Sequence, residues 1–163
     1  MQSRFIFNFF YSVNSPIILA AKRGNIECIQ LLLEAGVSPN FQDASGRSPL
    51  HLACWHGHTN AIPLLLKYHA SVNLTDFEGN TPLHYACWNG NLDICKALLN
   101  AGATVDIQDQ AGRTPLYYSV QHKHSDIVQF LLENHSDPTI QTCTGVTPES
   151  LATQENIDAI IEI

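Results

Sequence analysis

Eight histidines and five cysteines are the residues of this sequence that could hold a transition-metal ion. A tetrahedral zinc site needs about four such groups, usually in closely spaced pairs such as C-x-x-C and H-x-x-x-H. His56 and His58 are separated by one residue, as are His122 and His124, and no two cysteines form a C-x-x-C pair. The spacing therefore indicates no metal site, and we expect no cofactor.

The sequence also lacks the local motifs on which most catalytic sites depend. No glycine-rich loop suited to phosphate binding is present, and serine, histidine and aspartate residues form no recognisable nucleophile motif. We therefore expect the chain not to be an enzyme.

The segment 76–108 contains the elements that organise the chain. Thr81 is suited to cap a helix, and Pro82 then takes the first helical position, where its missing N–H costs nothing. Gly90 ends this short helix, and a second helix with an apolar stripe ends at Gly102. The alternating residues that follow predict a β-hairpin arm.

Helices this short need neighbours, because helix nucleation costs more than a few turns recover. The chain supplies neighbours by repetition, since segments 43–75 and 76–108 are identical at thirteen of thirty-three positions, where chance gives roughly two. The same spacing, without insertion, relates five dipeptides: Ser15-Pro16, Ser48-Pro49, Thr81-Pro82, Thr114-Pro115 and Thr147-Pro148.

The pattern D-x-x-G-x-T-P-L-H-x-A with this period is similar to the ankyrin repeat. Its residues in one copy are Asp76, Gly79, Thr81, Pro82, Leu83, His84 and Ala86. The resemblance implies an all-α solenoid of stacked helix-turn-helix pairs with short β-hairpin arms. It implies an extension over 1–9 and an ankyrin domain over 10–163, with repeats 10–42, 43–75, 76–108, 109–141 and a partial repeat 142–163. It also implies that His51 and His84 link neighbouring turns by hydrogen bonds.

Several positions depart from the repeat. Pro63 is expected about five residues into a second helix, where it would bend or loosen the preceding turn. His69, Lys123 and His135 replace glycine, and Lys123 in a left-handed turn should cost roughly 1 kcal/mol. Tyr117 replaces the usual histidine.

The charge balance limits the possible partners. With 8 basic and 15 acidic residues, the formal net charge of −7 argues against nucleic acid or an anionic membrane surface. No segment is long and apolar enough to span a membrane. Five cysteines without a pairing pattern are expected as reduced thiols, with Cys143 exposed, in a cytoplasmic or nuclear monomer. Residues 1–13 faintly resemble a signal peptide, but a degenerate hairpin or the start of a fragment also fits them.

What remains as a candidate site is a surface. In ankyrin repeats, partners usually dock on the hairpin tips and the exposed ends of the first helices, along the concave face. Trp55 and Trp88 are one period apart and should stand side by side, either as a binding hot spot or packed flat between repeats. The expected partner-binding residues are Arg47, Trp55, His56, Phe77, Asn80, Trp88, Asn89, Gln110, Arg113, Gln121 and His122.

Two functions follow from the resemblance. The first is a non-enzymatic module that binds another protein through its concave face. The alternative is an ankyrin regulatory or adaptor fragment of a larger protein, such as a kinase, a channel or a ubiquitin-ligase adaptor. No appended motif in the sequence favours one of these larger proteins.

Overall fold

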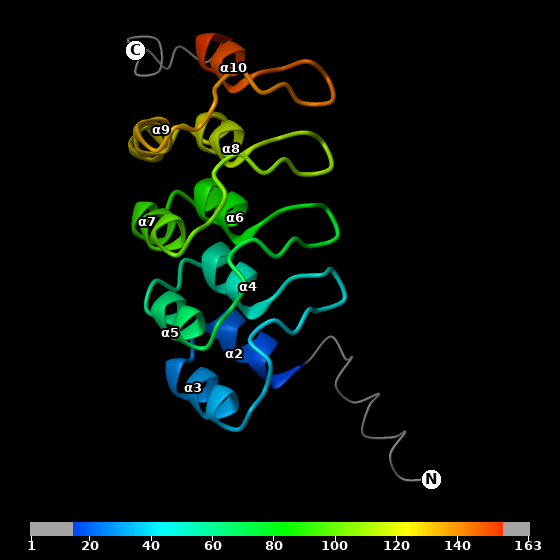
Figure 1. The fold of residues 1–163 in the computed structure, drawn as a ribbon, viewed down its shortest axis with the longest axis vertical. Helices are drawn as coiled ribbons and strands as arrows, with labels where there is room; N and C mark the ends of the chain where they lie inside the picture. The colour runs from blue at the N-terminus through cyan, green and yellow to red at the C-terminus, as the bar shows by residue number, and fades with distance from the viewer. Residues whose placement is uncertain (1–14, 155–163) are drawn as a thin grey trace.

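The computed structural model describes residues 15–154, which form an elongated stack of helix pairs (Figure 1). The expected extension over 1–9 and the second helix of the last repeat lie outside these described residues. The helices are α2 (Pro16–Arg23), α3 (Ile26–Glu34), α4 (Pro49–Trp55), α5 (Ala61–Lys67), α6 (Pro82–Asn89), α7 (Leu92–Asn100), α8 (Pro115–Gln121), α9 (Ser125–Glu133) and α10 (Pro148–Gln154).

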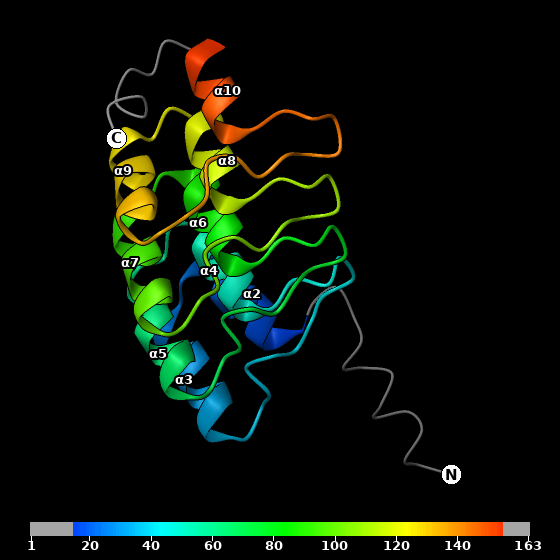
Figure 2. The same ribbon diagram turned by 45° about the horizontal axis from the view of Figure 1, so that its top comes forward.

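The helices form two layers. The first helix of each pair packs against the first helix of the next, so that α2, α4, α6, α8 and α10 make one row. The second helices α3, α5, α7 and α9 make the other row, and loops project from the stack on the side of the first row (Figure 2). The predicted all-α solenoid is confirmed.

Local capping explains where the helices begin and end. Ser48 and Thr81 precede α4 and α6, and each forms a capping box with the histidine three residues later. Asn91 caps α7 by accepting the backbone N–H of Ile94 at 3.1 Å. Gly90 ends α6 in the left-handed conformation, with a φ of 74°.

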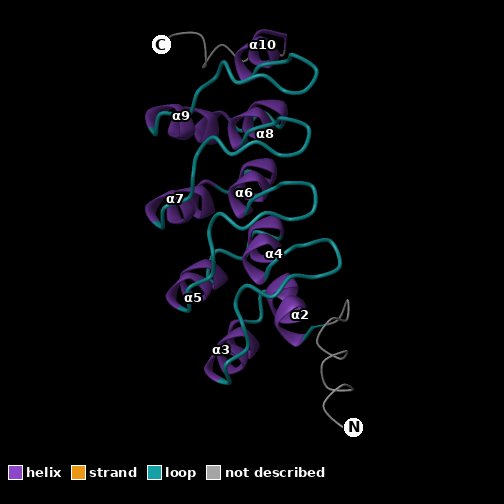
Figure 3. Ribbon diagram, turned by 45° about the vertical axis from the view of Figure 1, so that its right-hand side comes forward, coloured by secondary structure: helices purple, strands orange, loops and turns teal. Residues whose placement is uncertain are grey.

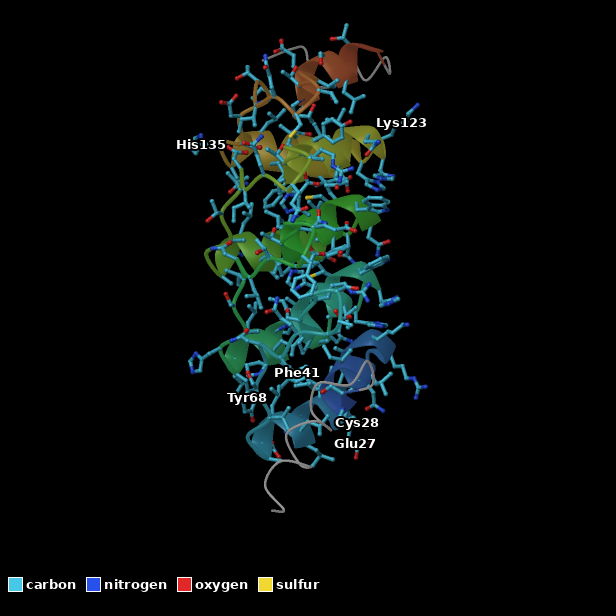
Figure 4. The ribbon with its side chains drawn as sticks, turned by 90° about the vertical axis from the view of Figure 1, so that its right-hand side faces the viewer. Glu27, Cys28, Phe41, Tyr68, Lys123 and His135 are labelled. Atoms are coloured by element: carbon cyan, nitrogen blue, oxygen red, sulfur yellow. The ribbon has the colours of Figure 1, made fainter. Side chains whose placement is uncertain are left out.

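Three non-glycine residues occupy left-handed positions, as the sequence predicted for the glycine replacements. His69, Lys123 and His135 have φ values of 64°, 60° and 65°. Lys123 and His135 project from opposite sides of the stack in Figure 4. A Cβ atom in this region crowds the following carbonyl, so each position carries local strain.

The prediction that Pro63 lies about five residues into a second helix is wrong, since Pro63 is the third residue of α5. By the spacing of α3 and α7, which start at Ile26 and Leu92, the second helix of this repeat would start at Thr59, but α5 starts at Ala61. Pro63 is therefore in the first turn, where its missing N–H costs no helical hydrogen bond. The turn before it is closed by hydrogen bonds that span three residues instead of the four of an α-helix. They run from the N–H of Ala61 to the carbonyl of His58 and from the N–H of Ile62 to the carbonyl of Thr59.

The expected β-hairpin arms are loops, since the structure assigns no strand within residues 15–154 (Figure 3). Each arm is a tight turn closed by backbone bonds, such as Asp76 N–H to Asn80 O and Gly79 N–H to Asp76 O. Successive arms share only single backbone bonds, such as Phe77 N–H to Ser45 O at 3.0 Å. A strand ladder needs successive paired bonds, which these arms do not make.

The core is a continuous seam between the repeats rather than a central cluster. Cys54 and Cys87 lie in it fully buried, as expected for residues on the inner face of a first helix. Cys95 is also buried, with its sulfur 3.8 Å from that of Cys87, and Cys143 is exposed as predicted. Burial holds the pKa of the Cys54 and Cys87 thiols well above the usual range, so both remain protonated.

Candidate partner-binding face

The buried histidines link one repeat to the next. The backbone N–H of Ser48 donates to Nδ1 of His51 at 3.0 Å, so the ring carries its proton on Nε2. Nε2 then donates to the carbonyl of Asn80 in the following arm at 3.1 Å. His84 repeats the arrangement with Thr81 and the carbonyl of Arg113. The predicted link between neighbouring turns is confirmed.

Burial lowers the pKa of both histidines, and for His84 it lowers the pKa to about 4. Both rings are therefore neutral at pH 7. With both ring nitrogens engaged in hydrogen bonds, these two residues hold the arms in place. They are structural residues and leave the exposed surface to other side chains.

Two indoles lie on the face formed by the first helices. Trp55 at the end of α4 stacks on Tyr85 of α6, with ring centroids 4.9 Å apart and planes at 15°. Trp88 in α6 lies against Tyr118 of α8 at 5.2 Å. Even so, Trp55 is 41% exposed and Trp88 is 49% exposed. Each indole thus packs against the next repeat and still offers much of its surface to solvent.

Arginines from two arms fold back onto these rings. Arg47 forms an ion pair with Asp43 at 2.8 Å, and its guanidinium lies 5.3 Å from the Trp55 ring. Arg113 pairs with Asp109 at 2.8 Å and lies 4.9 Å from the Tyr118 ring. Cation–π contact of this kind is worth about 0.5–1 kcal/mol at an exposed site. Both arginines lie at the bases of their arms rather than at the tips.

The tyrosine hydroxyls anchor the rings to the arms. Tyr85 donates to Oδ2 of Asp76 at 2.6 Å, and Tyr118 donates to Oδ2 of Asp109 at 2.8 Å. Burial and the adjacent carboxylate raise the pKa of each phenol far above its usual range, so both remain hydrogen-bond donors. The ring faces are thereby held in fixed orientations.

A pocket of about 250 Å³ lies between the exposed indoles. Its lining comes from three first helices and two arms: Trp55, Glu78, Asn80, His84, Tyr85, Trp88, Arg113 and Tyr118. Aromatic rings form most of its walls, and Glu78 supplies a carboxylate. Among the described residues, Glu78 makes no ion pair, and its carboxylate accepts one hydrogen bond, from the side-chain amide of Asn80 at 3.5 Å.

Two polar side chains of the following repeats donate hydrogen bonds to the backbone carbonyls of the two tryptophans. Asn89 donates to the carbonyl of Trp55 at 2.8 Å, and Nε2 of His124 donates to the carbonyl of Trp88 at 3.1 Å. His122 lies against the Trp88 ring at 4.7 Å, and its Nε2 is buried without a hydrogen-bond partner in the described structure. Its position over the indole thus extends the aromatic surface of Trp88.

The predicted partner-binding residues therefore divide into groups. Trp55, Asn80, Trp88 and Arg113 come together in the pocket. The others surround it or lie farther out: Arg47, His56, Phe77, Asn89, Gln110, Gln121 and His122.

Two features of this face differ from the expectation. Asn80 was expected on an exposed tip, but it is only 5% exposed, because its N–H donates to Asp76 and its carbonyl accepts from His51. Tyr85 and Tyr118 were not among the predicted residues. The signal for them was present, since both are aromatic residues one period apart, in the second turn of a first helix.

Within residues 15–154, no group of three or more histidine, cysteine, aspartate or glutamate side chains is placed to hold a metal ion. Nor is any helix of that part of the chain long and apolar enough to cross a membrane.

Comparison with known protein families gives three matches to a model of ankyrin repeats in three copies. The matches cover residues 17–109, 69–142 and 90–163, which is nearly the whole chain. The chain belongs to the ankyrin repeat family. A search of curated proteins found no match. Ankyrin repeats are generally protein–protein interaction modules and generally non-enzymatic.

Proposed function

We propose that this ankyrin stack is a non-enzymatic module, in the cytoplasm or nucleus, that binds another protein through the concave face around Trp55 and Trp88. The observation that carries the proposal is the exposure of these two indoles at 41% and 49%, on either side of a pocket. Aromatic anchors that are rigid before binding lose little conformational entropy when a partner covers them.

The rigidity of the two indoles comes from contacts within the stack. Trp55 is held by Tyr85 and Trp88 by Tyr118, and the phenols are anchored to the arms by carboxylates. A surface of this kind needs little reorganisation on binding. The predicted residues around it, including Phe77 at 66% exposure, would form the rim of the interface.

The test is capture of partners from the native cell on the immobilised full-length chain, with wild type compared with a Trp55→Ala/Trp88→Ala double variant. Truncation of a central aromatic anchor typically costs about 2 kcal/mol or more, equal to a loss in affinity of about thirtyfold. Captured proteins that depend on this face should disappear with the double variant.

The control variant is Leu31→Ala, because Leu31 is another large apolar residue, 59% exposed, but lies on a second helix, α3. It should leave capture unchanged. Since the indoles also pack against tyrosines, melting temperature must be measured for every variant. If the double variant melts much earlier while affinity per folded molecule is unchanged, the indoles are structural and the proposal is wrong.

A further inference from the structure

The third repeat differs from its neighbours at the residue four positions after the aspartate of its arm. In the second and fourth repeats this residue is Arg47 or Arg113, and each pairs with the aspartate of its own arm. In the third repeat it is Asn80, which follows Asp76. The pocket of about 250 Å³ is lined by this asparagine.

The surroundings that receive a guanidinium in the neighbouring repeats are all present in the third. Arg113 lies over Tyr118, and the equivalent ring one period earlier is Tyr85. Arg47 lies over Trp55, and the equivalent ring one period later is Trp88. The third repeat is thus the one that has both rings and lacks the arginine.

The acidic partner is also in place. In the fourth repeat, Oδ2 of Asp109 accepts both the hydroxyl of Tyr118 and Nε of Arg113, each at 2.8 Å. In the third repeat, Oδ2 of Asp76 accepts the hydroxyl of Tyr85 at 2.6 Å but makes no ion pair with any described residue. Glu78 adds a second carboxylate that makes no ion pair within the described part of the chain.

We propose that this pocket binds an arginine side chain of the partner protein, which takes the place that Arg47 and Arg113 hold in the flanking repeats. The guanidinium would lie over Tyr85 and Trp88 and pair with Glu78 of the pocket lining. Asp76, which lines the adjoining hollow beside Arg47 rather than this pocket, would add a second negative charge nearby. Arginine suits this pocket better than lysine, because a planar guanidinium stacks on rings and donates in a fork to carboxylates. The inference rests on the proposed function, since it names the chemistry of the partner.

The charges around the pocket are compatible with a cation. Arg113 lines the pocket, but Asp109 balances its charge. Asp76 and Glu78 remain without an ion pair among the described residues. The whole chain carries a net charge of −7, so a basic partner segment is also favoured at long range.

A direct test is titration of the isotopically labelled full-length chain with N-acetyl-arginine methylamide, followed by NMR at the indole N–H signals. The chain has only two tryptophans, so the signals of Trp55 and Trp88 report on the pocket. We expect a saturable shift of the Trp88 signal, with binding at least about threefold tighter than that of N-acetyl-lysine methylamide. N-acetyl-leucine methylamide should give no saturable shift.

The decisive variant is Asn80→Arg, which supplies the guanidinium from the chain itself. It should abolish the arginine-dependent shift without lowering the melting temperature, because Arg47 and Arg113 are accommodated in equivalent places. Gln129→Arg is the charge-matched control, since Gln129 is exposed on the second helix α9, and it should bind as wild type does. If Asn80→Arg fails to fold, Glu78→Gln tests the same pocket and should weaken binding at least about threefold.

Three results would overturn the inference: no saturable shift with the arginine derivative, equal affinity for the lysine or leucine derivative, or unchanged binding by the variant that is used. The titration needs no natural partner, so it separates this inference from the proposed function. Loss of capture with the tryptophan variants together with a negative titration would leave the binding face but exclude its arginine pocket.

Discussion

Acidification should weaken this fold through His84. The ring is buried, and Nδ1 must remain unprotonated to accept the backbone N–H of Thr81 at 3.0 Å. A proton on Nδ1 would face that N–H, and a charge on the ring would be buried. Burial of the ring lowers the pKa of His84 from its ordinary value of 6.5 to about 4.

The sign of the effect follows from the order in which the two states bind the proton. As the pH falls below about 6.5, the unfolded chain takes up a proton at this position while the folded chain does not, so the free energy of unfolding decreases. Each pH unit costs about 1.4 kcal/mol until the folded pKa is reached near pH 4. The full loss from this residue is therefore about 3 kcal/mol, a large part of the stability of a small domain.

The matched variant is His84→Asn. The asparagine carbonyl can still accept from the N–H of Thr81, but the side chain does not titrate and is too short to reach the carbonyl of Arg113. Losing that buried bond should destabilise the variant by about 1–3 kcal/mol at pH 7. Because the variant escapes the acid penalty at this position, its disadvantage should shrink as the pH falls.

The assay is urea unfolding of both proteins at several pH values between 7 and 4.5, followed by circular dichroism. Other groups also titrate in this range, including His51, whose pKa is lowered by the same kind of burial. The difference between the two proteins at each pH removes their contribution. Two stability curves that stay parallel from pH 7 to 4.5 would refute the reasoning, since His84 would then titrate alike in both states.

Two substitutions in the fourth repeat should stabilise the stack. Tyr117→His restores the histidine that links one arm to the next, with the carbonyl of Val146 as its acceptor by the spacing of His51 and His84, and should raise the free energy of unfolding by about 1 kcal/mol. An unchanged urea midpoint would mean that the ring does not reach that carbonyl. Lys123→Gly relieves a side chain at a φ of 60° and should gain up to about 1 kcal/mol, reduced by the entropy that glycine adds to the unfolded chain. A clear fall in melting temperature would show that a contact of Lys123 outweighs the strain.

The repeat fold was predictable because the same local signals recur at a constant spacing. Thr81, Pro82 and Gly90 define the limits of α6 by capping and backbone conformation, which depend on neighbouring residues alone. The left-handed backbone at Lys123 followed from the glycines at equivalent positions.

The two wrong predictions about the fold have different causes. Pro63 was misplaced because the start of α5 is set by the proline itself and not by the period. The arms were expected as β-hairpins from an alternating pattern, but the backbones of successive arms share single hydrogen bonds and form no strand ladder.

The candidate site was predictable only in part. Periodicity placed Trp55 and Trp88 side by side, but it could not decide between packing and exposure. The structure has both at once, since each ring contacts a tyrosine of the next repeat and is still nearly half exposed. The tyrosines were missed because helix α4 has Leu52 at the equivalent position, so the aromatic pair does not belong to the repeat consensus.

Residues that follow the repeat explain the fold, and residues that break it are the better guide to binding. His51 and His84 obey the pattern and are buried in links between repeats. Asn80 breaks the pattern set by Arg47 and Arg113, which pair with Asp43 and Asp109. The equivalent carboxylate of the third repeat, Asp76, has no ion-pair partner among residues 15–154. A stack with every ion pair complete would gain stability at this point and lose a charged pocket. In the proposed mode of binding, the missing arginine and the two indoles mark the same place, where an arginine of the partner would make the contact that Arg47 and Arg113 make in the flanking repeats.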